Sequence, residues 1–136
     1  MCKIYYKKGY EYQLERSFEI LTGIIPLQEG GNDFVKINKS GMLTLSRGYA
    51  WDGPSGPAIH TPNFLRGSLV HDALYQLVRL GILNEETHRD AADKFLQELV
   101  LEDGMNSLRA WWVYKAVHWF GGVYLRNKDT EVLKAP

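Results

Sequence analysis

The chain has a single cysteine, no excess of charge of either sign and no long run of apolar residues. Cys2 alone excludes an intramolecular disulfide framework and is typical of a protein kept in a reducing cytosol. Sixteen basic residues balance sixteen acidic ones, so no global field attracts a phosphate backbone and we expect no nucleic-acid partner. Because no stretch approaches the roughly 20 apolar residues of a membrane span, we also expect no transmembrane segment.

The first residues are charged and aromatic rather than apolar, so we expect no signal peptide. With 136 residues, of which 45% are apolar, the chain is predicted to form one soluble globular domain. The domain is expected to cover residues 1–126, with a β-rich part at 1–47 and a helical part at 64–125. Residues 127–136 are polar and predict a loose tail.

The first third of the chain favours short antiparallel strands. Apolar and β-branched residues predict strands at residues 4–6, 10–14, 18–25, 33–37 and 42–46. The Asn-Lys-Ser-Gly sequence at 38–41 suits a tight turn between the last two of these strands. Gly30, Gly31 and Asn32 are predicted as a loop within the sheet. Regular structure is expected to lapse between residues 47 and 63, which contain several glycines and prolines.

The rest of the chain favours helices. The pattern predicts a first helix over 65–80, with its start signal at 61–63, and a second helix from Asn84 to about residue 102. Their connection is so short that the two helices must be antiparallel neighbours. A third helix, rich in aromatic residues, is expected at 107–125. The sequence thus predicts an α+β fold with a small N-terminal antiparallel sheet, a helical hairpin and a third aromatic-rich helix.

A polar stripe interrupts the first predicted helix, which is otherwise apolar. At about 100° per residue, one sector of its surface holds Ser68, His71, Asp72, Tyr75 and Arg79. On the second helix, Asp93 is the acid best placed to reach His71 and Tyr75. A carboxylate bound to one imidazole nitrogen fixes the tautomer and leaves the other nitrogen free to take a proton from water. Asp72 is expected to point toward the loop of Asp52, where the two carboxylates would hold a cation.

The His71-Asp72-Ala73-Leu74-Tyr75 run on one helix, with Asp93 on its antiparallel partner, resembles the active-site helix pair of the calcium-dependent phospholipase A-two superfamily. The resemblance implies that His71 is the base that activates water, that Asp72 binds calcium, and that Tyr75 and Asp93 support His71. It also implies a lipid or other ester substrate. Residues 49–54 read Tyr-Ala-Trp-Asp-Gly-Pro, which departs from the glycine-rich calcium loop of that family.

A longer part of the chain resembles a family of small phage and prophage proteins of unknown function. The shared features are an Asp-Gly-x-Ser-x-Pro loop at 52–57, the His-Asp-x-x-Tyr run at 71–75, Ala-Asp at 92–93 and an aromatic closing helix. The resemblance implies a phage origin, and hence a place in the cytoplasm of an infected bacterium or in the virion. Phage structural proteins would then be among the partners.

Each of these features also has a structural interpretation. The stripe residues and Asp93 would then form a satisfied polar seam between two helices, because buried networks orient side chains without doing chemistry. Asp52 would then only form a turn. The aromatic third helix would close a core, contact another protein or lie at a lipid surface.

Overall fold

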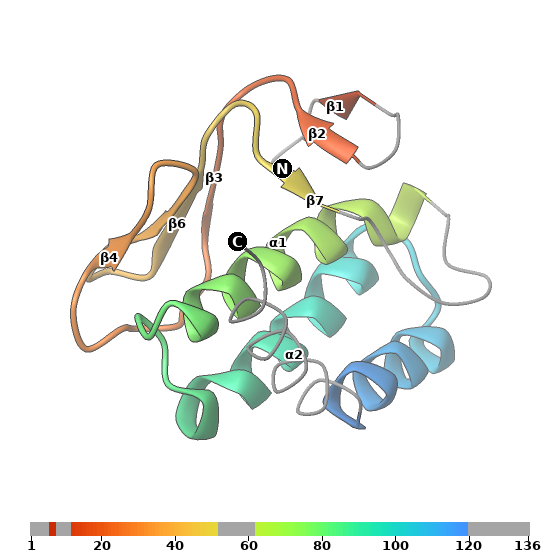
Figure 1. Ribbon diagram of the computed structural model, residues 1–136. Coiled ribbons are helices and arrows are strands. Elements are labelled where there is room, and N and C mark those ends of the chain that lie inside the picture. The colour runs from red at the N-terminus through yellow and green to blue at the C-terminus, as the bar shows by residue number, and fades with distance from the viewer. Residues whose placement is uncertain (1–5, 8–11, 52–61, 120–136) are drawn as a thin grey trace, which may run out of the picture.

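The computed structural model describes residues 6–7, 12–51 and 62–119. Within these residues the N-terminal part forms antiparallel strands and the C-terminal part forms three helices. The predicted α+β fold is therefore confirmed. Figure 1 shows the strands on one side of a pair of neighbouring helices.

The strands form two antiparallel sheets. The smaller sheet has the order β1-β2-β7 and consists of β1 (Tyr6–Lys7), β2 (Tyr12–Leu14) and β7 (Ala50–Trp51). The larger sheet has the order β3-β6-β5-β4 and consists of β3 (Phe18–Leu21), β4 (Gly30–Gly31), β5 (Val35–Ile37) and β6 (Met42–Leu45). Side chains alternate between buried and exposed along β3 and β5, as expected for a sheet with one face on a core.

Two predictions about the strands were wrong. The loop predicted at residues 30–32 contains the short strand β4, in which Gly30 pairs with Ile37. A Cβ atom on Gly31 would collide with the backbone oxygen of Val35, so glycine is what allows this close pairing. The irregular segment predicted from residue 47 contains β7, whose Ala50 pairs with Gln13 of β2. Both strands are short and depend on pairing with distant residues, which local sequence patterns do not report.

The third predicted strand, at residues 18–25, is shorter than expected because the chain turns after Leu21. The Thr22 hydroxyl donates to the carbonyl oxygen of Gly41 at 2.8 Å and accepts from the Ile24 amide at 3.0 Å. Gly23 has a φ of 74°, a conformation that favours glycine. The local bond from the Ile24 amide to the Thr22 hydroxyl takes the place of a further ladder bond, and the chain leaves the sheet at this turn.

The helices agree closely with the prediction. Helix α1 (Pro62–Arg79) begins within the predicted start signal, three residues earlier than the apolar pattern indicated. Helix α2 (Glu85–Glu102) has the predicted N-cap, because the Asn84 side chain accepts a hydrogen bond from the Thr87 amide at 2.9 Å. A third helix covers residues 107–119. Its predicted continuation to residue 125 and the predicted tail lie outside the described residues.

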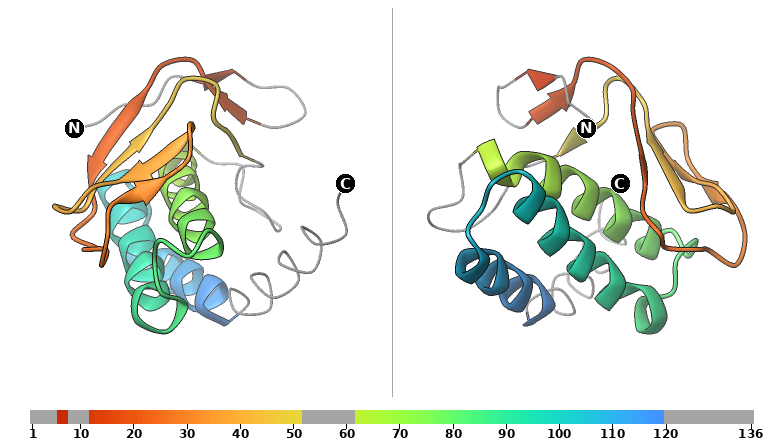
Figure 2. Two further views of the ribbon diagram at one scale, coloured as in Figure 1. Left: turned by 60° about the vertical axis from the view of Figure 1, so that its left-hand side comes forward. Right: turned by 180° about the vertical axis from the view of Figure 1, so that it is seen from behind.

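Helices α1 and α2 lie side by side and antiparallel, as predicted (Figure 1). Arg66, near the start of α1, forms ion pairs with Glu102 and Asp103 at the end of α2. The helices approach closely because Gly67 faces α2, where an added Cβ atom would lie 2.7 Å from Leu96 Cδ1. Figure 2 shows the larger sheet against one side of this pair and the third helix against another.

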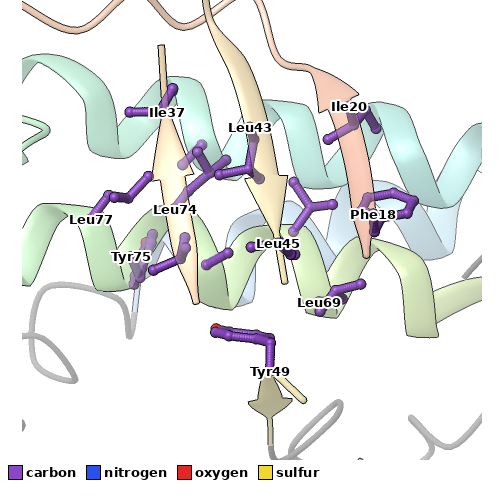
Figure 3. Packing of buried hydrophobic residues seen from close by; sticks show 14 of the residues in the cluster. Phe18, Ile20, Ile37, Leu43, Leu45, Tyr49, Leu69, Leu74, Tyr75 and Leu77 are labelled. Carbon is purple, nitrogen blue, oxygen red and sulfur yellow. The ribbon is translucent and has the colours of Figure 1, made fainter. Parts of the chain in front are cut away.

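Two apolar clusters correspond to these two contacts. In the larger cluster, side chains of β3, β5 and β6 pack against α1, as Figure 3 shows for Leu43, Leu45 and Leu74. The smaller cluster joins the third helix to the helical pair and contains Phe64, Leu96, Val100, Met105 and Ala110. The core therefore lies on the apolar faces of α1, whereas Arg66, His71 and Tyr75 of this helix reach α2 and its C-cap.

One interpretation of the sequence expected the aromatic third helix to close a core. The tryptophans of this helix do not do so. Exposed fractions are 44% for Trp111, 61% for Trp112 and 77% for Trp119. The small residue Ala110 makes the buried contact instead, with Val113 and Val117 packed beside it. None of the described helices combines the length and the apolar character that crossing a membrane requires.

Candidate functional site

The carboxylate of Asp93 lies at the centre of a polar cluster between α1 and α2. Its side chain is fully buried, and one of its oxygens, Oδ1, lies 2.7 Å from His71 Nε2. The Tyr75 hydroxyl donates to the same oxygen at 2.6 Å. His71 and Tyr75 are one turn apart on α1, so both reach the same point on α2. The predicted contact of Asp93 with both residues is present.

The environment of the cluster keeps the phenol of Tyr75 protonated. Burial raises the pKa of the Tyr75 phenol above its usual value, and the neighbouring Asp93 raises it further. Tyr75 therefore remains a neutral hydrogen-bond donor and does not act as a base. When Nε2 of His71 is the donor to Asp93 Oδ1, the other ring nitrogen, Nδ1, is left as an acceptor. About 10% of the His71 side chain remains accessible.

A second group of polar residues extends the cluster to the third helix. The Tyr114 hydroxyl donates to Asp90 Oδ1 at 2.7 Å, and Lys94 Nζ lies 3.2 Å from Asp90 Oδ2. His118 Nδ1 lies 3.3 Å from Asp90 Oδ1 and 3.4 Å from Asp93 Oδ2. The hydrogen bond from Tyr114, helped by Lys94 and His118, holds the pKa of Asp90 below its usual value. The same bond raises the pKa of Tyr114 to about 12.

The sequence pattern did not identify Tyr114 or His118 as members of the site. They are four residues apart on a helix and therefore share one face, and their rings stack with centroids 5.5 Å apart. The four-residue spacing indicates that these two side chains share a face, but the helix has aromatic residues on its other faces as well, so the pair does not stand out in the sequence. Arg89 NH1 donates to the backbone oxygen of His118 at 3.0 Å, which ties the third helix to α2 next to Asp93.

The rest of the predicted stripe has mixed roles. Ser68 is buried and its hydroxyl donates to the Leu65 carbonyl oxygen at 2.9 Å, a common local bond within a helix. Asp72 is half-buried and takes part in at least one polar or electrostatic interaction. Its predicted metal partner Asp52 lies outside the described residues. Among the described residues, no group of three or more His, Cys, Asp or Glu side chains is arranged to hold a metal ion.

A hollow of about 510 Å³ lies elsewhere, on the larger sheet. It is lined by residues of β4, β5 and β6 and the turns between them, among them Glu29, Lys36 and Asn38. None of its lining residues belongs to a helix. The convergence of acids, imidazoles and phenols is therefore at the junction of the three helices, and we assign the candidate site there.

These observations define a class of protein: an α+β protein with a buried carboxylate between an imidazole and a phenol. The family model described as "Protein of unknown function (DUF1353)" matches residues 32–117. This is more than half of the chain, so the chain belongs to this family. The match covers His71, Tyr75, Asp90, Asp93 and Tyr114 and ends one residue before His118. No curated protein and no solved structure matches the chain.

Proposed function

We propose that the protein is a small hydrolase in which His71 takes a proton from a water molecule that attacks an ester carbonyl. The observation that supports this proposal is the 2.7 Å contact between His71 Nε2 and Asp93 Oδ1, with Tyr75 bound to the same oxygen. A buried carboxylate orients the imidazole and stabilises the imidazolium that forms. The resemblance of the His-Asp-x-x-Tyr run to phospholipases A-two suggests a phospholipid-like ester as substrate.

In the proposed reaction the free nitrogen of His71 is the base and later the acid. Nδ1 accepts a proton as the water oxygen bonds to the carbonyl carbon, and the resulting imidazolium then donates that proton to the departing alkoxide. The products are a carboxylic acid and an alcohol. Asp93 remains ionised throughout, because its negative charge is what stabilises the imidazolium. Tyr75 keeps the carboxylate from rotating away from His71.

A calcium ion is the expected cofactor of this hydrolase. Asp72 and Asp52 would hold it, since carboxylate oxygens are the ligands that calcium prefers. When bound, the ion would polarise the ester carbonyl. A calcium titration followed by melting temperature tests this part on its own, because a ligand that binds only the folded state raises its stability. We expect a rise in the wild type and none in Asp72→Asn; the same result in both proteins would exclude Asp72 as a ligand.

Turnover of a short-chain phospholipid, followed by titration of the released acid, tests the proposed hydrolase. The assay compares the wild type with His71→Gln, with either calcium or a chelator present. The matched control is His88→Gln, since His88 lies on α2 and bonds the Asn84 amide rather than Asp93. We expect His71→Gln to lower kcat on the order of 100-fold or more and His88→Gln to leave it unchanged. Equal rates in all three proteins, or no turnover of any ester by the wild type, would contradict the proposal.

A second function is favoured by the exposed face of the third helix. Trp112 and Trp119 are largely exposed, as is Leu108 at 68%, and large apolar side chains at the surface often mark a docking site. In this alternative the protein is a non-enzymatic virion or accessory protein of a phage, and the His71 cluster is structural. The phage origin rests on the motif at residues 52–57 and 71–75, which resembles phage and prophage proteins.

Binding to purified phage particles separates the two functions. If the alternative holds, the wild type sediments with the particles, the double variant Trp112→Ser/Trp119→Ser does not, and no ester is hydrolysed. Ester turnover that depends on His71, together with no sedimentation of the wild type, would exclude the alternative. The same particles show whether the protein is in the virion or remains in the host cytoplasm.

A further inference from the structure

Asp93 has a second oxygen that the proposed reaction does not use. Oδ2 is buried, and it has no hydrogen-bond partner among the described residues. His118 Nδ1 is buried and lacks a hydrogen-bond partner in the same part of the chain. The two atoms lie 3.4 Å apart. Buried polar atoms are nearly always paired in native proteins, so two such atoms facing each other suggest one shared bond.

The His118 ring is held in this position by its neighbours. Tyr114 stacks on it with an interplanar angle of 25°, and Arg89 binds the backbone oxygen of the same residue at 3.0 Å. About 41% of the His118 side chain is exposed, so the ring has one edge toward Asp93 and another toward solvent. Nδ1 is therefore directed at the acids, while the rest of the ring keeps contact with water.

Two carboxylates lie within reach of a proton on His118 Nδ1, and leaving Asp93 without this donor costs more free energy than leaving Asp90 without it. Asp90 Oδ1 already accepts a hydrogen bond from Tyr114, and the Asp90 side chain is 43% exposed and can bind water. Asp93 is fully buried and has no such access. Leaving a buried acceptor unpaired carries the full desolvation cost of that atom. A hydrogen bond from His118 Nδ1 therefore stabilises the folded protein more when it goes to Asp93 Oδ2 than when it goes to Asp90 Oδ1.

We propose that His118 is a positioning residue of the hydrolase: its Nδ1–H donates to Asp93 Oδ2, so that one carboxylate is bound by two imidazoles, one on each oxygen. This inference rests on the proposed function for its effect on turnover, whereas the contact itself does not. With both oxygens occupied, the carboxylate has one rotational position and presents Oδ1 to His71 Nε2. The third helix then belongs to the site, because the site lacks one donor without it.

Two variants distinguish a donor at Nδ1 from a side chain that only fills space. In His118→Asn the amide nitrogen comes close to the place of Nδ1, whereas in His118→Gln it comes close to the place of Nε2. We expect His118→Asn to retain kcat, and His118→Gln to lower kcat on the order of 10-fold with an unchanged KM. Circular dichroism shows whether each variant is folded. A merely structural role would give the two variants the same kcat.

A nitrogen-15 NMR spectrum of the imidazoles tests the contact without any substrate. We expect neutral His118 in the wild type to carry its proton on Nδ1, and the His71 resonances to shift in His118→Gln but not in His118→Asn. A proton on Nε2 of His118, or His71 resonances that ignore both substitutions, would overturn the proposal. If the wild type hydrolyses no ester but the spectrum is as expected, the proposed function fails and the contact between His118 and Asp93 stands.

Discussion

Asp93 is the residue on which the site depends, because its carboxyl group is completely buried between the helices. A carboxylate removed from water needs hydrogen-bond donors on its oxygens. The Tyr75 hydroxyl donates to Oδ1, and His71 Nε2 lies within hydrogen-bond distance of the same oxygen. Tyr75 is the neutral donor, since burial raises its pKa and keeps the phenol protonated. This requirement explains why one helix places a phenol and an imidazole one turn apart.

Removing the Tyr75 hydroxyl should weaken the folded state, because Asp93 Oδ1 then loses a hydrogen-bond donor. We expect Tyr75→Phe to lower the free energy of unfolding by about 1–3 kcal/mol, the usual effect of losing a hydrogen bond to a charged group. Urea denaturation of Tyr75→Phe, Asp93→Asn and the double variant measures the coupling between the two residues. Strictly additive effects would show that the 2.6 Å contact does not stabilise the protein.

Tyr114 should affect stability in alkaline solution. Its pKa is raised from 10.0 to about 12 by the hydrogen bond to Asp90. The protonated form is the one favoured by folding, so its contribution is complete below pH 10 and is lost as the pH rises toward 12. We expect the difference in unfolding free energy between the wild type and Tyr114→Phe to shrink over this interval. A difference that is constant from pH 9 to 12 would contradict this assignment.

The helical pair has an ion pair at one end and the site near its middle. Arg66 is buried, and its guanidinium binds Glu102 at 2.9 Å and Asp103 at 3.1 Å. Burial by itself lowers the pKa of Arg66, but the hydrogen bonds to Glu102 and Asp103 outweigh it and raise the pKa. These bonds help to fix the axial position of α1 against α2. The position of His71 relative to Asp93 depends on this axial register.

We therefore expect Arg66→Ala to destabilise the protein by about 2 kcal/mol, somewhat below the usual loss for a fully buried pair because Glu102 is half exposed. Lys94→Ala is the matched control. Lys94 forms an exposed i,i+4 pair with Asp90, and such pairs contribute at most about 0.5 kcal/mol. Thermal or urea unfolding gives both values, and equal losses would show that the Arg66 pair has no special role.

The sequence predicts the helical elements better than the strands, for physical reasons. Helix α2 has local signals, an N-cap at Asn84 and a strong apolar period, and both are confirmed. The antiparallel packing of α1 and α2 follows from their short connection, and the facing positions of His71, Tyr75 and Asp93 follow from that packing. Strands β4 and β7 have only two residues each and are defined by their partners, so no local pattern indicates them.

In the molecule as a whole, the larger sheet and the third helix pack on different sides of the helical pair (Figure 2). Leu74 of α1 is fully buried against the sheet (Figure 3). We expect Leu74→Ala to lower the free energy of unfolding by about 2–5 kcal/mol. The control Leu21→Ala removes a side chain that is 58% exposed and should change it by less than about 0.5 kcal/mol. Similar effects of both substitutions in urea would contradict this packing.

The packing of the third helix on α2 explains why the sequence did not identify Tyr114 and His118 as members of the site. His118 is 25 residues from Asp93 in the chain, and a connection of several residues separates their two helices. The spacing of Tyr114 and His118 places them on one face of the third helix, but it does not specify that this face meets α2. That choice is made by Ala110 and the valines beside it, which pack into the smaller apolar cluster, and it places Tyr114 and His118 on the acids.

A nitrogen-15 NMR spectrum of the His71 imidazole tests most directly whether Asp93 holds this ring by Nε2 and leaves Nδ1 to react. At neutral pH we expect the proton on Nε2, a bare Nδ1 and a clear change of both resonances in Asp93→Asn. A proton on Nδ1 in the wild type, or resonances that do not respond to Asp93→Asn, would contradict the assignment of His71 as the base.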